Sequence, residues 1–252
     1  LQEQVPARRC VPQARVRDGA GAGRGAGRDD LVRVVRGVRR LLGARPGRVV
    51  GRARGERDES FGEQGGVTDG GREVIVHAVI NSPDFVGSDA TYDPERSLLS
   101  ERYPGTFATH VWVPATNLVD KPSELSFAQA ACLPTAWLTA YRMLFSQSGA
   151  RPGDTVLVQG AGGGVATALI TLGRQAGMRI WVTSRDEARG AQAVSLGAHQ
   201  AFPAGARLPD RVDAVMESVG AATWSHSINV LKPGGALVIC GATSGDNPPK
   251  AE

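Results

Sequence analysis

Short apolar segments alternate with helix-like segments between residues 155 and 241, and this alternation restricts the fold more than any other feature. Apolar runs joined by helices form a parallel sheet that is covered by helices on both faces, through right-handed crossovers. The sequence therefore predicts an α/β fold with a doubly wound parallel sheet. The expected strands are 155–160, 179–184, 200–202, 212–220 and 236–241, and the expected helical segments are 165–177, 186–198 and 222–235.

A glycine-rich stretch, GAGGGVA (160–166), joins the first strand of this region to its first helix. Glycine permits a tight turn and lets a pyrophosphate approach the backbone, and a helix N-terminus offers free N–H groups to an anion. The alternative is a turn required only for close packing. We favour the register AGGGVA (161–166), because alanine is tolerated at its last position. The residues expected at the pyrophosphate are Ala161, Gly162, Gly163, Gly164 and Val165.

The residues after the second strand bear on the choice of cofactor. An acidic residue there binds the adenosine ribose of NAD, whereas an arginine accommodates the 2′-phosphate of NADP. In TSRDE (183–187), Ser184 and Arg185 come first, and Asp186 follows one residue too late. NADP(H) is therefore favoured over NAD(H), and the alternative is an ordinary solvated arginine at a helix start.

The first 65 residues differ in composition from the rest. Residues 1–60 contain more than half of the arginines, but no Phe, Trp, Tyr, His, Ile, Met, Lys, Asn or Thr. Three interpretations stay open: a disordered arm, a nucleic-acid-binding arm without aromatic residues to stack on bases, and GC-rich DNA translated out of frame. We favour the last, because Phe, Tyr, Met, Ile, Asn and Lys have AT-rich codons. The stretch 31–42 has the spacing of a basic amphipathic helix, or reflects composition alone.

Between this arm and the α/β region, the sequence predicts strands and a lobe. GREVIVHAVI (71–80) is apolar on both sides, as in a buried strand. Segment 106–122 contains a strand that ends at Pro114. Segment 81–105, which is rich in Pro, Asp, Ser and Gly, is expected to be a surface loop or lobe.

Residues 123–145 have the pattern of two helices separated at Pro134, with Ser126 as the N-cap of the first. With 41% hydrophobic residues, the chain can bury a core. It has no apolar run of about 18 residues and no apolar leader, so we expect neither a membrane span nor a signal peptide. Three scattered cysteines without a CxxC pair favour a reducing, cytoplasmic setting.

The chain resembles the medium-chain dehydrogenases/reductases, most closely their quinone-oxidoreductase-like and zinc-type alcohol-dehydrogenase-like members. The resemblance implies a partial GroES-like, β-rich catalytic domain over 66–133 and a Rossmann dinucleotide-binding domain over 134–252, with 1–65 outside the pattern. The stretches that carry it, over roughly 66–245, are GTFATHVWVPATNLVDKP, AACLPTAWLTAYRML, PGDTVLVQGAGGGVA, SLGA, VDAVMESVG and LKPGGALVICG.

The resemblance also implies where the rest of the cofactor lies. Val219 and Gly220 would line the nucleotide cleft after the fourth strand of the Rossmann domain. Gly241 and Ala242 would follow the fifth strand near the nicotinamide, and Thr139 would lie under the nicotinamide ring.

This chain departs from the zinc-binding members at their ligand positions. The first 65 residues do not resemble the family's first strands, which carry a Cys ligand and a Gly-His-Glu segment; no such segment is present, and the lobe at 81–105 contains no cysteine. Thr135 stands at the last ligand position, and Cys132 lies three residues too early. We therefore expect no zinc, which requires a tetrahedral set of thiolate or imidazole ligands. Two histidines remain as isolated strand residues: His77 and His110.

The implied chemistry is hydride transfer between a nicotinamide cofactor and a small-molecule substrate. Without zinc, a quinone or a conjugated enone is favoured over a simple alcohol or carbonyl. No general acid is assigned, because core packing is favoured for the nearest candidate, Tyr141. The chain ends before the family's sixth Rossmann strand, so the alternatives are a non-catalytic nucleotide-binding remnant and, less favoured, a basic-arm nucleic-acid binder. A homodimer is left open.

Overall fold

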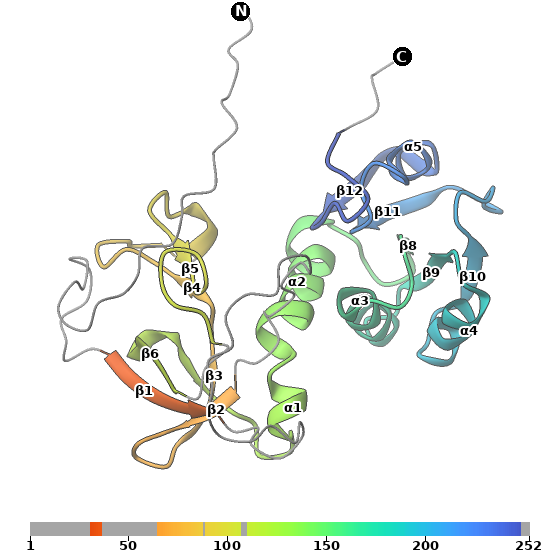
Figure 1. Ribbon diagram of the computed structural model, residues 1–252. Helices are drawn as coiled ribbons and strands as arrows, with labels where there is room; N and C mark the ends of the chain where they lie inside the picture. The colour runs from red at the N-terminus through yellow and green to blue at the C-terminus, as the bar shows by residue number, and fades with distance from the viewer. Residues whose placement is uncertain (1–30, 37–64, 88, 107–109, 248–252) are drawn as a thin grey trace, which may run out of the picture.

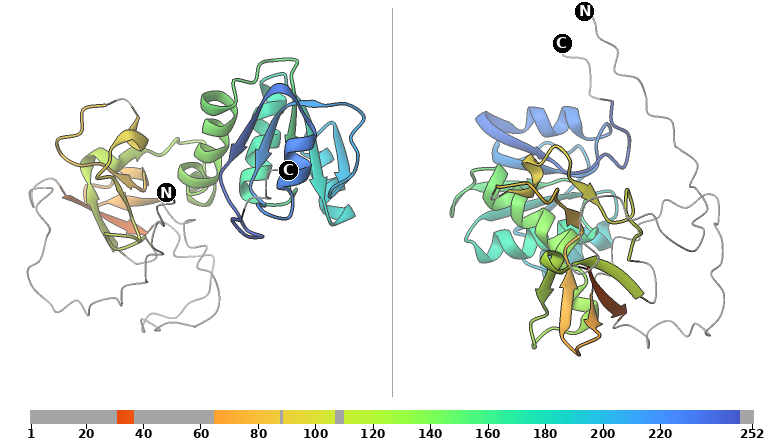
Figure 2. Two further views of the ribbon diagram at one scale, coloured as in Figure 1. Left: turned by 90° about the horizontal axis from the view of Figure 1, so that it is seen from above. Right: turned by 90° about the vertical axis from the view of Figure 1, so that its left-hand side faces the viewer.

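The computed structural model describes residues 65–87, 89–106 and 110–247, and the backbone alone of residues 31–36. Within them, a β-rich part and an α/β domain lie on either side of a helical connector, as Figure 1 and Figure 2 show. None of the described helices is long and apolar enough to span a membrane.

The β-rich part contains an antiparallel sheet in the order β6-β1-β2-β3-β7. Val74 and Val76 of β3 and Val113 of β6 are almost completely buried in its core. These strands confirm the expected strand positions within 71–80 and 106–122. The strands are β1 (Leu31–Arg36), β2 (Gly65–Thr68), β3 (Glu73–Val76), β6 (His110–Pro114) and β7 (Leu118–Asp120).

Strand β1 corrects the helix that the spacing of segment 31–42 suggested. Leu31–Arg36 form a strand instead, and this strand pairs antiparallel with β2 and β6. The valines of LVRVVR favour an extended backbone, and the strand fills the place between two partners that are distant in sequence. The remaining residues to which the expectations of an arm or an out-of-frame segment apply, 1–30 and 37–64, lie outside the described residues.

The lobe at 81–105 is organised around one buried carboxyl group. Asp93 accepts hydrogen bonds from the backbone N–H groups of Ser82 (2.7 Å) and Glu95 (2.8 Å) and from Asn81 Nδ2 (3.1 Å). Little other regular structure is present in the described part of the lobe. Its short elements are η3 (Ala90–Tyr92) and β5 (Ser97–Leu98), which pairs with β4 (Val79–Ile80).

The connector begins with the expected N-cap. The Ser126 hydroxyl accepts a hydrogen bond from the Gln129 N–H, and Gln129 Oε1 accepts one from the Ser126 N–H, which completes a capping box. The helix is interrupted before Pro134, as expected. It then continues with one π-helical segment before α2 and another after it. The segments are α1 (Phe127–Ala130), η5 (Leu133–Trp137), α2 (Leu138–Tyr141) and η6 (Arg142–Gln147).

The α/β domain is a parallel sheet in the order β10-β9-β8-β11-β12, which confirms the predicted fold class. The last helix is shorter than the expected 222–235, because β12 already begins at Leu231. The strands are β8 (Thr155–Val158), β9 (Arg179–Ser184), β10 (Gln200–Pro203), β11 (Val212–Glu217) and β12 (Leu231–Ile239), and the helices are α3 (Gly164–Gln175), α4 (Glu187–Ser195) and α5 (Trp224–Asn229).

Alternation along β8 shows how this sheet is buried on both faces. Val156 and Val158 belong to the large cluster that includes Leu169 and Ile170 of α3, whereas Leu157 joins the cluster on the opposite face. The chain moves outward from β8 through β9 to β10, and then returns to the other side of β8 with β11 and β12. Ligands of such sheets bind at the carboxyl edge, where this reversal leaves a crevice between β8 and β11.

Candidate functional site

The loop between β8 and α3 contains two glycines in the left-handed region. Gly160 has φ +80° and Gly162 has φ +106°, values that side-chain-bearing residues rarely adopt. A Cβ on Gly160 would lie only 2.8 Å from Val219 Cγ2. Ala161 is buried, and its N–H donates to Thr183 O at 2.8 Å. The first half of the loop thus fixes the turn, and it lies against the ends of β9 and β11 as well as following β8.

The second half of the loop forms an open helix N-terminus. The first hydrogen bond of α3 runs from the Thr167 N–H to Gly163 O, so the amides of residues 164–166 have no partner within the helix. Gly163 is the N-cap, and no side chain caps the helix there. A Cβ on Gly163 would meet no atom within 4 Å. This arrangement is suited to an anion, because N–H groups and the helix dipole both point to open space.

Two small residues allow α3 to approach its neighbours. A Cβ on Gly164 would lie 3.3 Å from Ala136 Cβ of η5, and Ala166 is buried in the core. A small residue at the packing position of the motif is what the register AGGGVA assumes for Ala166. Val165 is half-buried in the first turn of the helix.

The end of β9 presents an arginine beside a structured turn. The Ser184 hydroxyl donates to Asp186 O at 2.7 Å and accepts from the Asp186 N–H at 3.1 Å. The Asp186 carboxylate caps α4 by accepting from the Arg189 N–H. Arg185 is exposed and makes no hydrogen bond or ion pair with the described residues. Asp186 and Ser184 are thus occupied locally, and Arg185 is available to an anion.

A second arginine, which the sequence interpretation missed, lies beside the glycine-rich loop. A Cβ on Gly162 would lie 2.9 Å from Arg189 Cδ and 3.6 Å from Arg189 Nε, so the stem of Arg189 crosses the loop. The spacing of Arg185 and Arg189, four residues apart at a helix start, is the only signal that the sequence contains. Arg189 thus lies beside the glycine-rich loop, and Arg185 is exposed at the end of β9.

The loops after β11 and β12 are joined to each other. Ser244 N–H and Oγ both donate to Val219 O at 2.7 Å, and the Ala221 N–H donates to Gly245 O at 2.9 Å. Gly220 has φ +95°, and a Cβ there would lie 2.8 Å from Ala242 Cα. The resemblance placed Val219 and Gly220 in the nucleotide cleft and Ala242 near the nicotinamide, and in the structure these residues lie together. Gly241 lies against the same loop, with its Cβ position 3.2 Å from Ser218 O.

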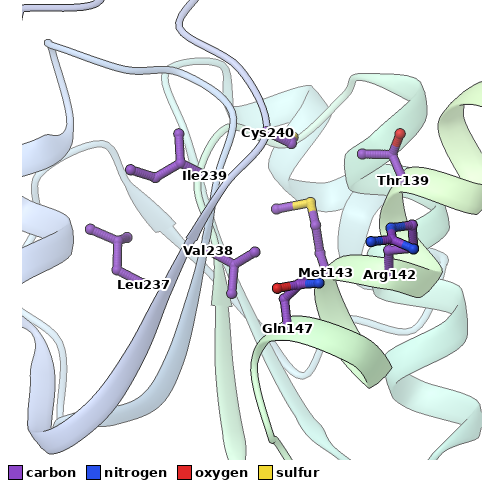
Figure 3. Close-up of a pocket in the computed structure, with 8 residues that line it drawn as sticks. All are labelled: Thr139, Arg142, Met143, Gln147, Leu237, Val238, Ile239 and Cys240. Carbon is purple, nitrogen blue, oxygen red and sulfur yellow. The ribbon is translucent and has the colours of Figure 1, made fainter. Parts of the chain in front are cut away.

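Thr139 lines an open pocket of about 460 Å³ between the connector and β12 (Figure 3). The strand side of the pocket consists of residues 237–240, which directly precede Gly241. The Cys240 residue is exposed, but desolvation of its sulfur, followed by the nearby Glu217 carboxylate, raises the pKa of the thiol. The other residues from the connector are Arg142, Met143 and Gln147.

Tyr141 does not have the packing role that the sequence favoured. Its side chain is 53% exposed, and its ring lies 4.9 Å from that of Phe145, also an exposed residue. The helix turns Thr139 toward the pocket, whereas Tyr141 is absent from the pocket lining. The described residues therefore assign no general acid.

The residues at the family's zinc positions do not converge in the described part of the chain. Cys132 Sγ donates to Ala128 O, and the partly buried His77 ring has a pKa lowered by burial. No group of three or more His, Cys, Asp or Glu side chains that could hold a metal ion occurs among the described residues. The described residues thus bring together no tetrahedral set of thiolate and imidazole ligands.

An open parallel sheet with a reversal at β8, a glycine-rich turn and an uncapped helix N-terminus at that point define an α/β domain of the Rossmann type. Residues 164–251 match the family model described as zinc-binding dehydrogenase. Most of the α/β domain is thus similar to the zinc-binding dehydrogenases, and the resemblance to medium-chain dehydrogenases/reductases is confirmed.

Similar proteins extend this match beyond the α/β domain. The crotonyl-CoA carboxylase/reductase of Cereibacter sphaeroides is 31% identical over 216 residues, which are 70% of this chain and 50% of that protein. The crystal structure of an NAD-dependent alcohol dehydrogenase is 31% identical with a TM-score of 0.67, covering 72% of this chain and 60% of the other. A crotonyl-CoA carboxylase/reductase in complex with NADP is 28% identical with a TM-score of 0.67, over 74% and 59%. The chain spans about half the length of the curated relative.

Proposed function

We propose that this chain binds NADP(H) at the carboxyl edge of its parallel sheet and transfers a hydride between that cofactor and a small molecule. The observation that carries the proposal is the uncapped N-terminus of α3 at the strand reversal, with open space in front of Gly163. The exposed arginines Arg185 and Arg189 favour NADP(H), because NAD(H) has no 2′-phosphate to pair with them. The complex of a similar structure with NADP supports the same preference.

Several of the predicted residues have a role in this proposal. The amides of Gly164, Val165 and Ala166 would bind the pyrophosphate, and Gly163 would leave room for it. The joined loops after β11 and β12 would line the cleft through Val219, Gly220, Gly241 and Ala242. Thr139 would face the nicotinamide end, since it shares a pocket with the residues before Gly241. The bound cofactor would supply the hydride, and the protein would position it and exclude water.

For the substrate, we propose an acceptor that is already activated for hydride addition, such as a quinone or a double bond conjugated to a carbonyl. The described residues bring no zinc ligands together, so nothing among them polarises a simple carbonyl in that way. A relative named for reduction of crotonyl-CoA supports a conjugated double bond.

The test is a pair of titrations followed by an assay on the full chain. NADPH and NADH are titrated by fluorescence, and NADPH oxidation is then followed with a quinone, an enal and crotonyl-CoA. The proposal predicts tighter binding of NADPH than of NADH, and oxidation with at least one conjugated acceptor. Binding without turnover would favour the alternative, a nucleotide-binding protein that does not catalyse. A folded protein that binds neither nucleotide would overturn the proposal.

A further inference from the structure

A buried carboxyl group lies at the end of β11, directly before one of the loops that we place beside the cofactor. Glu217 is fully buried, and no lysine or arginine pairs with it among the described residues. Its Oε1 accepts from the N–H groups of Val219 (2.7 Å) and Gly220 (3.1 Å). Its Oε2 accepts from the hydroxyls of Thr223 (2.8 Å) and Ser227 (2.6 Å). Four donors thus fill the carboxyl group.

A buried amide has the matching position at the end of β8, directly before the glycine-rich loop. Gln159 is fully buried, and its Nε2 donates to Ser227 Oγ at 2.9 Å. Its Oε1 accepts from Thr183 Oγ1 at 2.6 Å, and Thr183 Oγ1 accepts from the Gly160 N–H at 3.2 Å. The first amide of the glycine-rich loop is therefore held by the same side chains that reach Ser227.

The orientation of the Gln159 amide is fixed by a third contact. Gln159 Nε2 lies 2.9 Å from His226 Nδ1, and His226 Nε2 lies 2.9 Å from Ala206 O. Since the carbonyl can only accept, His226 Nε2 donates and its Nδ1 accepts. The nitrogen of Gln159 therefore faces two acceptors, and its oxygen faces a hydroxyl donor.

We propose that these side chains form one positioning device for dinucleotide binding. We call it the Glu217–Thr183 network and define it as Thr183, Gln159, Ser227 and Glu217. The network is continuous from the Gly160 N–H to the Val219 and Gly220 N–H groups, and each hydroxyl in it accepts one hydrogen bond and donates one. It links the ends of β9, β8 and β11 through α5, and so sets the glycine-rich loop relative to the loop after β11. This inference rests on the proposed function.

Apolar side chains of similar size would fill the same space in the core, but they would leave the loop amides unpaired. A hydrogen-bonded network inside a protein fixes one arrangement of its members, because every alternative leaves a buried polar group without a partner. The network therefore specifies loop position as well as contributing to folding.

The first test compares two substitutions at Thr183. Thr183→Val keeps the shape of the side chain but removes the hydroxyl, whereas Thr183→Ser keeps the hydroxyl and removes a methyl group. We expect Thr183→Val to weaken NADPH binding about tenfold, which corresponds to the loss of a buried hydrogen bond. Thr183→Ser should restore affinity to within about threefold of wild type. Equal affinities for the two variants would overturn the inference.

The second test asks whether the two ends act together. Thr183 and Glu217 share no direct hydrogen bond, so independent effects of Thr183→Val and Glu217→Gln on NADPH affinity would add. A single device predicts instead that the double variant binds little worse than the weaker single variant. If Glu217→Gln does not fold, Ser227→Ala takes its place, because it removes the central link. Additive losses would overturn the inference.

A stability control separates positioning from general weakening of the fold. Met178 is 2% exposed and lies before β9, at the opposite edge of the sheet. Met178→Ala removes buried apolar contacts and so lowers the unfolding midpoint, but it does not alter the Glu217–Thr183 network. We expect this variant to retain wild-type NADPH affinity when fully folded. If it binds as weakly as Thr183→Val, the inference fails. If wild type itself does not bind NADPH, the proposed function fails, and this inference fails with it.

Discussion

At the scale of single residues, the structure separates groups that are occupied by local bonds from groups that remain available to a ligand. Asp186 follows β9, where an acidic residue would favour NAD, yet its carboxylate is used to cap α4. Arg185 and Arg189 are exposed on the same helix start. Arg185 and Arg189 are therefore the cations available to a phosphate near this position, and cofactor preference can be tested by substituting single residues.

Replacing Arg185 with alanine should weaken NADPH binding selectively. Arg185→Ala removes the cation that we place at the 2′-phosphate, and it should cost about tenfold or more in NADPH affinity. NADH affinity should stay unchanged, because NADH lacks that phosphate. Fluorescence titration measures both. Arg179→Ala, which removes the same charge from the start of β9 at the opposite edge of the sheet, is the control. Parallel losses for NADH and NADPH would contradict this assignment.

His199 should make the stability of the α/β domain depend on pH. Its Nδ1 accepts the Ile180 N–H at 2.9 Å, and desolvation, then Arg174 and Arg179, lower the pKa of His199 below 6.5. The folded state therefore binds fewer protons than the unfolded state, so stability falls as the pH drops below about 6.5. Urea unfolding at pH 7.5 and pH 5.5 measures this loss. His199→Asn, which keeps an acceptor near Nδ1 but does not titrate, should lose less; equal losses would contradict the prediction.

At the scale of elements, the glycines of the glycine-rich turn fall into two groups: those that the fold requires, and one that we attribute to ligand binding. Gly160 and Gly162 have positive φ, and Gly164 lies close to Ala136, so these three glycines are required by the fold. Gly163 has φ −88° and open space around its Cβ position. Nothing in the fold requires glycine at residue 163, and we attribute its presence to the pyrophosphate.

Gly163→Ala should therefore uncouple binding from stability. The change alters an N-cap without strain, so the free energy of unfolding should change by less than about 1 kcal/mol. The added methyl group would occupy the space in front of the α3 amides, and NADPH affinity should fall about tenfold or more. Denaturant unfolding and NADPH titration measure the two effects. Gly162→Ala, at φ +106°, is the comparison that should lose stability as well. Unchanged NADPH affinity in Gly163→Ala would place the pyrophosphate elsewhere.

The same elements show how far the sequence could be interpreted alone. The parallel strands and the capping box at Ser126 were predictable, because each depends on periodicity or on residues close in sequence. Strand β1 was not, since its pairing with β2 and β6 joins segments that are far apart in the chain. Arg189 was missed for a similar reason: its contact with Gly162 arises only when α4 packs beside the glycine-rich loop.

At the scale of the whole molecule, the lobe at 81–105 is tied to the helix that carries Thr139. Asp89 Oδ2 lies 3.0 Å from Arg142 Nη2, and Arg142 lines the same pocket as Thr139. The Thr91 N–H, then the Thr91 hydroxyl and Arg142, lower the pKa of Asp89 to about 2. Because this pKa lies below the ordinary 3.8, the ionised contact is present at neutral pH and is lost only as the pH falls toward 2.

Asp89→Asn should loosen the lobe without disturbing the α/β domain. The substitution removes the charge that holds Arg142 but leaves the size of the side chain unchanged. We expect faster amide hydrogen exchange over residues 89–106, and unchanged exchange in β8, β9 and β11, because opening of the lobe is local. Lys232→Gln, which breaks the Lys232–Asp213 ion pair inside the α/β domain, is the control that should leave the lobe unchanged.

The partner substitution decides whether the ion pair itself is responsible. If Asp89 acts through Arg142, Arg142→Gln alone should speed exchange of the lobe, and adding Asp89→Asn should speed it little further. Asp89 also accepts the N–H and hydroxyl of Thr91, so an effect on that turn alone would persist in the Arg142→Gln background. Additive effects in the double variant would mean that the lobe is held by its own turn, and that its position does not depend on the helix carrying Thr139.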